Sequence, residues 1–169
     1  MISRERSPVY WAIAPFNNID PDMVERTWFY DSHYDVIAVG WDKVGAIANL
    51  DKNQLQRAMR ESYRDQPGAW KSLWAFYHDI QKDDYIVART GRSTILGLGQ
   101  VTGDAYFDEK RGRTRVGGQH AWYKPHFRDV HWLQTERIHF GHYVFSIPTV
   151  TRIGKHLPEI RRRLENVGG

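Results

Sequence analysis

Two β-prone segments on either side of a short glycine-containing turn constrain the fold of this chain more than any other feature. The segments Asp84–Arg89 (DYIVAR) and Thr94–Thr102 (TILGLGQVT) flank the tetrapeptide Thr90–Ser93 (TGRS). Strand-like runs of this length around a glycine turn are typical of an antiparallel hairpin. The chain therefore contains a β-sheet, and its other segments must pack against that sheet.

Strand-like and helical segments occur in mixed order around this hairpin. Further strands are expected over Val9–Ala14, Tyr34–Gly40, His126–Leu133 and His142–Ser146. Helices are expected over Met23–Trp28, Asn53–Tyr63, Ala69–Ile80 and Pro158–Val167. Asp20 and Asp51 are placed to cap the first two helices, and Pro21 suits a first helical position. This order predicts an α+β fold in which helices surround a curved mixed sheet or small β-barrel. Residues 1–169 fit one domain.

Composition excludes several classes of protein. The chain has no cysteine, which rules out a disulfide scaffold, a cysteine nucleophile and thiolate metal sites. No apolar run reaches the roughly 18 residues of a spanning helix, and the charged N-terminus lacks the apolar region of a signal peptide. We therefore expect a cytoplasmic protein with no membrane partner. The net charge of +4 is compatible with a polyanionic partner.

Familiar catalytic and nucleotide-binding motifs fit this sequence poorly. The glycines of Gly97–Gly103 are misplaced for a dinucleotide loop and lie in a strand-like run, so they favour strand bending or close backbone approach. Asp108 and Lys110 match the loose acidic-x-Lys pattern of metal-dependent nucleases, which remains an alternative. His126 and His131 are five residues apart and face opposite sides of a straight strand. No metal site and no cofactor are expected.

Aromatic residues in turns form the most informative pattern. The chain has seven Trp, nine Tyr and seven Phe. Trp41 lies in a glycine-bracketed turn after one strand, Trp122 and Tyr123 precede another, and Phe16 and Asn17 follow the first strand. If these strand ends converge, the rings form a slot in which a flipped nucleobase stacks while an amide hydrogen-bonds to its edge.

Cationic residues in an expected loop over Glu109–Gly118, together with one at the hairpin tip, are candidates for DNA backbone contacts or for filling the gap left by a flipped base. They are Lys110, Arg111, Arg113, Arg115 and Arg92. The alternative interpretation is that they are solvated surface charges, and for the loop the sequence favours neither.

Three segments resemble the EVE/YTH-like branch of the PUA superfamily. They are Gly40–Gly45 (GWDKVG), Phe76–Gly103 and His126–Leu133. Within this branch the chain is similar to the N-terminal DNA-binding domains of McrB-type modification-dependent restriction proteins. The resemblance covers about Val9–Leu133, most of the chain.

The resemblance implies a curved, barrel-like sheet and an aromatic cage that holds a modified base. Trp41 and Trp122 match cage tryptophans, and Phe16 and Asn17 match a base-contacting segment that is Lys-Ser in many members. It implies a reader domain and not an enzyme, with an AAA+ GTPase module in the same protein and a nuclease subunit as partners. We expect DNA carrying N6-methyladenine as the ligand, with methylated cytosine as a weaker option and methylated RNA as the alternative.

Overall fold

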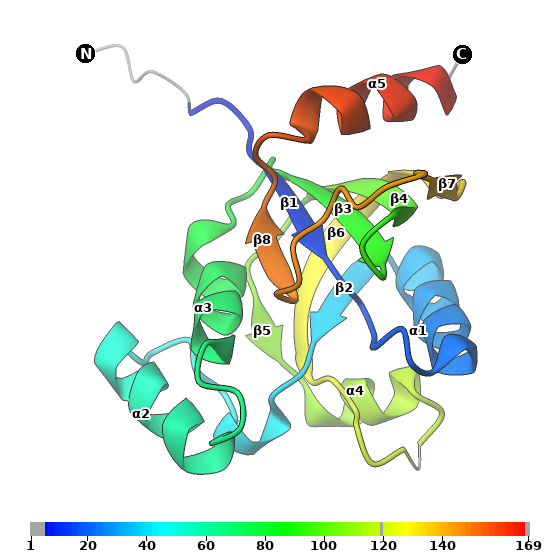
Figure 1. Ribbon diagram of the computed structural model, residues 1–169. Helices are drawn as coiled ribbons and strands as arrows, with labels where there is room; N and C mark the ends of the chain where they lie inside the picture. Colours follow the sequence, from blue (N-terminus) through cyan, green and yellow to red (C-terminus); the bar gives the residue numbers. More distant parts are fainter. Residues whose placement is uncertain (1–5, 119, 168–169) are drawn as a thin grey trace.

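A strongly curved mixed sheet forms the centre of the computed structural model, which describes residues 6–118 and 120–167 (Figure 1). The strands follow the order β2 (Val36–Val39), β6 (His126–Gln134), β4 (Thr94–Val101), β3 (Tyr85–Thr90), β1 (Tyr10–Ile13) and β8 (Val150–Arg152). In addition, β5 (Tyr106–Phe107) pairs with β6, and β7 (Ile138–His139) pairs with β4. Strands β1 and β3 are parallel, and the other pairs are antiparallel.

Helices surround this sheet. They are α1 (Pro21–Tyr34), α2 (Lys52–Ser62), α3 (Ala69–Trp74), α4 (Glu109–Arg115) and α5 (Leu157–Val167), with a 3₁₀ turn over Asp42–Val44 and a π-helical turn over Ala75–Asp79. In Figure 1, α2 and α3 lie on one side of the sheet, α1 on the other, α5 above it and α4 below it. The α+β prediction is confirmed. No helix of the described residues has the length and apolarity needed to cross a membrane.

The predicted hairpin is present as β3 and β4, and glycines allow its close packing. A Cβ atom at Gly97 would lie 2.8 Å from the Gln134 carbonyl oxygen, and one at Gly99 would lie 2.8 Å from Trp132 Cε3. The register of β4 on β6 shifts between Leu98 and Gly99. These glycines thus serve the close approach of strand β6, as the sequence suggested, and not a nucleotide loop.

Helix capping follows the sequence, although one helix is longer than predicted. The Asp20 side chain accepts a hydrogen bond from Met23 N at 3.1 Å, and Asp51 forms a capping box with Gln54. Helix α1 continues past Trp28 to Tyr34 and ends where Asp35 adopts a left-handed conformation. The following strand therefore begins at Val36 and not at Tyr34.

Two other predictions are wrong. The expected loop over Glu109–Gly118 contains helix α4, because Asp108 caps it by accepting from Arg111 N at 2.9 Å. No strand forms over His142–Ser146; the amides of Val144 and Phe145 instead donate to the Arg92 carbonyl.

A buried ion pair joins α1 to α4. Arg115 Nε lies 2.7 Å from Asp31 Oδ1, and Arg115 Nη2 lies 2.6 Å from Oδ2. Nη2 also donates to the Pro15 carbonyl at 3.1 Å. Both charged side chains are completely buried. Arg115 is therefore a structural residue, and its predicted contact with the DNA backbone is wrong.

Removing one partner of this ion pair should destabilise the fold severely. We expect Asp31→Ala to lower the free energy of unfolding by about 3–5 kcal/mol, because an unpaired guanidinium stays buried. Glu25→Ala, which breaks the exposed pair with Arg137, should cost less than about 1 kcal/mol. Urea unfolding followed by tryptophan fluorescence measures both. Similar losses for the two variants would contradict the structural role of Arg115.

Candidate functional site

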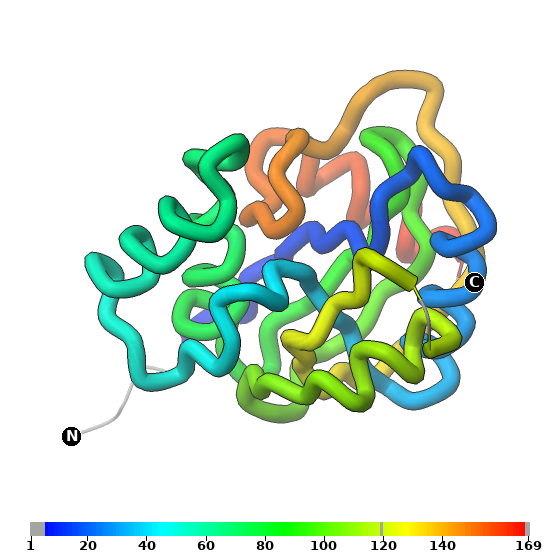
Figure 2. Tube along the Cα trace, turned by 90° about the horizontal axis from the view of Figure 1, so that it is seen from below, coloured from blue at the N-terminus to red at the C-terminus, as the bar shows by residue number. Residues whose placement is uncertain are grey.

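A cavity of about 790 Å³ opens below the sheet, where loops from separate parts of the chain meet. Seen from below, the segments after β1 and β2 and the segment before β6 come together near the centre of the view (Figure 2). The α2–α3 turn and residues near Thr149 complete the wall. Sites for small molecules typically enclose roughly 300–1,000 Å³, so this cavity has room for a planar ligand.

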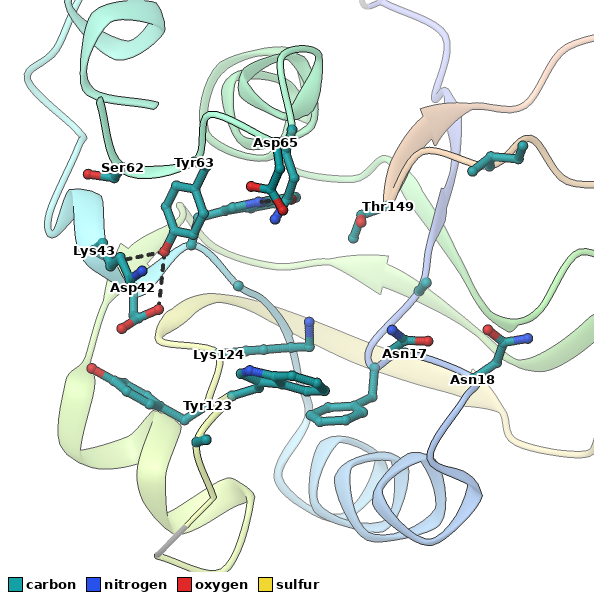
Figure 3. A pocket seen from close by; sticks show the side chains of 18 of the residues that line it. Asn17, Asn18, Asp42, Lys43, Ser62, Tyr63, Asp65, Tyr123, Lys124 and Thr149 are labelled. Atoms are coloured by element: carbon teal, nitrogen blue, oxygen red, sulfur yellow. Dashed lines mark hydrogen bonds between the residues drawn. The ribbon is translucent and has the colours of Figure 1, made fainter. Parts of the chain in front are cut away.

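All five residues that the sequence suggested as base contacts line this one cavity: Phe16, Asn17, Trp41, Trp122 and Tyr123. Phe16 and Tyr123 are buried in its wall, whereas Trp122 exposes 69% of its surface and Trp41 is partly exposed. Figure 3 shows Asn17 and Tyr123 on different sides of the cavity. The two tryptophans are thus accessible to a ligand rather than sealed in the core.

Trp41 is held by contacts to both its backbone and its ring. Its φ of 68° is left-handed, which is unfavourable for a residue with a large side chain. Its carbonyl oxygen lies 3.1 Å from His126 Nε2, and Tyr77 Oη lies 2.6 Å from His126 Nδ1. Because a carbonyl only accepts, His126 donates from Nε2 and receives the Tyr77 proton at Nδ1. The Trp41 indole N–H donates to Gln66 Oε1 at 3.1 Å.

His126 is a neutral structural residue. Burial lowers its pKa to about 4, against a weaker opposing effect of the Trp41 carbonyl. His131 is exposed on the other face of β6, as the strand spacing predicted. Within residues 6–118 and 120–167, neither belongs to a cluster of potential metal ligands.

A hydrogen-bond network lies along another wall. Tyr63 Oη donates to Asp42 Oδ1 at 3.1 Å and accepts from the Lys43 amide at 3.0 Å (Figure 3). Burial raises the pKa of Tyr63 to about 12, so the phenol keeps its proton. Asp42 therefore offers a fixed acceptor to the cavity. Asp42 and Lys43 directly follow Trp41 in the GWDKVG segment, where sequence reasoning singled out only the tryptophan.

Lys124 projects its ammonium group into the cavity (Figure 3). Nζ lies 5.1 Å from the centre of the Phe16 ring. No carboxylate of the described residues lies within ion-pair distance of it. The residue is partly exposed, yet protein atoms surround the ammonium, and burial together with Arg115 lowers the pKa of Lys124 to about 8. Sequence reasoning missed Lys124, although it follows Tyr123 directly.

Arg89 is a second cation of the cavity that the sequence did not reveal. It is 4% exposed, and its guanidinium donates to the carbonyl oxygens of Ile147 at 3.1 Å and Pro148 at 2.8 Å. Burial lowers its pKa to about 10, with Arg92 contributing. Arg89 therefore fixes the wall segment by binding its backbone. A charged residue directly after the apolar run Ile86–Ala88 was the available signal.

The five cations predicted to contact DNA do not line the cavity. Arg111 Nε donates to Tyr30 Oη at 3.0 Å, and Tyr30 is not among the residues that line the cavity. Arg92 donates to the Phe145 carbonyl at 3.0 Å. Both serve internal hydrogen bonding in this structure, as Arg115 does.

Lys110 and Arg113 remain exposed on α4. Arg113 pairs with Glu109 at 3.1 Å, and its guanidinium lies 4.1 Å from the centre of the Tyr123 ring. These two residues are the members of the predicted set that stay accessible to a phosphate backbone beside the cavity.

Because His126 is neutral when it donates to the Trp41 carbonyl, the free energy of unfolding should depend on pH. The unfolded chain binds a proton at His126 near pH 6.5, whereas the folded chain does so only near pH 4. Stability therefore falls as the pH drops through this window, by about 3 kcal/mol from this residue. We expect His126→Gln to flatten this slope in urea unfolding and His131→Gln to leave it unchanged. A slope unaffected by His126→Gln would contradict the assignment.

Comparisons with known proteins place this geometry in context. No curated protein matches the sequence. Among solved structures, the crystal structure of the YTH domain of the Zygosaccharomyces rouxii MRB1 protein, in complex with N6-methyladenosine RNA, is similar with a TM-score of 0.50. The alignment covers 97% of this chain and 90% of that chain at 9% sequence identity. This likeness shows a YTH-like fold, while the resemblance to McrB-type domains stays a prediction.

A family model also matches the sequence itself. The model is described as a domain of unknown function, DUF8426, and it matches residues 11–153. The match includes every strand of the sheet except the first residue of β1, and all the loops that surround the cavity. Because it spans well over half of the 169 residues, this chain belongs to the DUF8426 family.

Proposed function

We propose that this domain binds nucleic acid carrying a methylated base and takes the flipped base into the cavity. The observation that carries this proposal is the meeting of Trp41, Trp122 and Phe16, from three separate segments, in one accessible cavity. Aromatic faces stack on any base, and hydrogen-bonding side chains at the edge read its identity. The YTH-like fold of the domain supports the same function.

The proposed ligand is N6-methyladenine. Its exocyclic amine keeps one N–H donor, for which the fixed Asp42 carboxylate is a suitable acceptor. Its ring nitrogens are acceptors, for which Lys124 and the Asn17 amide are suitable donors. The methyl carbon adds about 0.8 kcal/mol when it is buried against the rings. The similar YTH structure contains N6-methyladenosine, which supports this choice of base.

Apolar side chains at the mouth of the cavity favour duplex DNA as the source of the base. Trp122 and Ile147 line the cavity and expose 69% and 74% of their surfaces. Flipping a base from a duplex costs a few kcal/mol, and an inserted apolar side chain offsets part of this cost. Lys110 and Arg113 are available for phosphate contacts. We further propose that the domain directs a GTPase module and a nuclease to methylated DNA.

Methylated RNA is the second candidate ligand, because the similar YTH domain was crystallised with RNA. A single-stranded base needs no extrusion from a duplex. The nuclease alternative has less support, since the Asp108 carboxylate caps α4. In the described part of the chain, Asp108 belongs to no group of three potential metal ligands.

Removing one ring of the cage should weaken binding of the methylated base. We expect Trp41→Ala to reduce affinity for N6-methyladenine duplex DNA about 5- to 150-fold, which corresponds to about 1–3 kcal/mol of lost stacking. Fluorescence anisotropy with methylated and unmethylated duplexes measures this change. Phe29→Ala is the matched control, because Phe29 is an exposed aromatic residue on α1 outside the cavity.

Two outcomes would overturn parts of this proposal. Equal affinity of the unaltered protein for methylated and unmethylated duplexes would exclude a methylated-base reader. Competition with single-stranded RNA and DNA of the same sequence distinguishes the two candidates, because stronger competition by methylated RNA would replace DNA as the proposed ligand.

Binding should also depend on the charge of Lys124. Its pKa of about 8 means that the ammonium is mostly protonated at pH 7 and loses its proton as the pH rises through 8. We expect affinity for the methylated duplex to fall between about pH 7 and pH 9, while ordinary lysines stay charged. Lys124→Met should weaken binding about 10- to 150-fold, as for a lost charged hydrogen bond, and should remove this pH dependence.

Lys110→Met is the control for this experiment, because Lys110 is exposed and lies outside the cavity. This variant should bind more weakly to both duplexes alike and keep the pH dependence of the unaltered protein. A pH dependence that persists in Lys124→Met would show that another group is responsible.

A further inference from the structure

We infer that His142, His156 and Glu159 form a binding site for a zinc ion, outside the cavity described above. His142 Nε2 lies 2.8 Å from Glu159 Oε1, and His156 Nδ1 lies 3.6 Å from Glu159 Oε2. One potential ligand atom from each residue lies within 4.8 Å of the other two. Two imidazole nitrogens and a carboxylate oxygen therefore converge on one point of the surface.

The spacing of these atoms is close to what zinc requires. Zinc binds imidazole nitrogen and carboxylate oxygen at about 2.0–2.2 Å in tetrahedral geometry, which sets neighbouring ligand atoms roughly 3–3.6 Å apart. Glu159 Oε2 lies 3.1 Å from His142 Nε2 and 3.6 Å from His156 Nδ1, within this range. His142 and His156 expose 56% and 30% of their side chains, so small rotations are open to both rings.

Two firmly held segments carry the three ligands. His156 and Glu159 are three residues apart at the start of α5, where Ile160 N donates to the His156 carbonyl at 3.0 Å. Ile160 is completely buried and anchors the helix. His142 follows Phe140, whose amide donates to the Ser93 carbonyl at 2.8 Å. The site is thus assembled by the fold from positions that are distant in sequence.

The chemistry of the ligand set favours zinc over the hard cations. Imidazole suits zinc and other late transition metals, whereas calcium and magnesium prefer sites made of oxygen atoms. Glu159 neutralises one of the two charges of the ion. Exposure of His142 leaves a position for water, as in sites with three protein ligands.

Ion pairing is the competing explanation of this cluster, and the two explanations differ in the imidazole atoms that they use. An ion pair requires N–H groups directed at the carboxylate, whereas a metal requires lone pairs of neutral rings. Zinc would also connect α5 to the segment from Phe140 to Thr149, whose far end lines the cavity.

Isothermal titration of untagged, chelator-treated protein with zinc chloride near neutral pH tests this inference. We expect one equivalent of zinc to bind and the melting temperature to rise when zinc is present. His142→Ala and Glu159→Gln should each weaken zinc binding at least tenfold and abolish the rise. His142 is exposed and Glu159 is partly exposed, so both variants should remain folded.

His131→Ala is the matched control, because His131 is an exposed histidine on β6 and should leave zinc binding unchanged. Two results would overturn the inference. One is no heat of binding at sub-millimolar zinc, which would leave the cluster as ion pairs. The other is zinc binding that His142→Ala and Glu159→Gln do not weaken, which would place the metal elsewhere.

Discussion

The buried ion pair between Arg115 and Asp31 is the interaction on which the arrangement of this domain depends. It joins α4 to α1 and, through the Pro15 carbonyl, holds the segment that continues into Phe16 and Asn17. A charge without a partner at this position would be far more costly than the paired arrangement is favourable. The same guanidinium contributes to the low pKa of Lys124. The ion pair thus affects both the shape and the charge of the cavity.

Internal contacts hold the residues of the cavity in place. Trp41 keeps an unfavourable backbone conformation because the buried His126 donates to its carbonyl and Gln66 accepts from its indole. Arg89 similarly fixes the wall segment near Ile147 by donating to backbone carbonyls. Rings and loops that are already ordered lose little entropy on binding, so more of the stacking energy contributes to affinity. Strain at Trp41 is consistent with a functional position.

The positions of the cationic residues could not be predicted from the sequence alone. A run of Lys and Arg within residues 109–115 has the composition of a backbone-contacting loop. In the structure, Asp108 starts a helix there, and its Arg111 and Arg115 turn inward to Tyr30 and Asp31. The cations that line the cavity are Lys43, Arg89 and Lys124, none of which belongs to that run. Clustering of charge thus says little about which face a cation occupies.

The sequence by itself determined the structural features that depend on interactions between residues close together in the chain. The β3–β4 hairpin, the caps at Asp20 and Asp51 and the glycine turn around Trp41 depend on residues within a few positions of each other, and local pattern records such interactions. Only the tertiary structure decided which residues meet across long separations. Arg115 pairs with a residue 84 positions away, and Lys124 enters a cavity built from six segments. His142 meets Glu159 only because α5 packs beside the segment that follows β7. These contacts depend on how the sheet curves and where each helix docks, and no local pattern encodes that geometry.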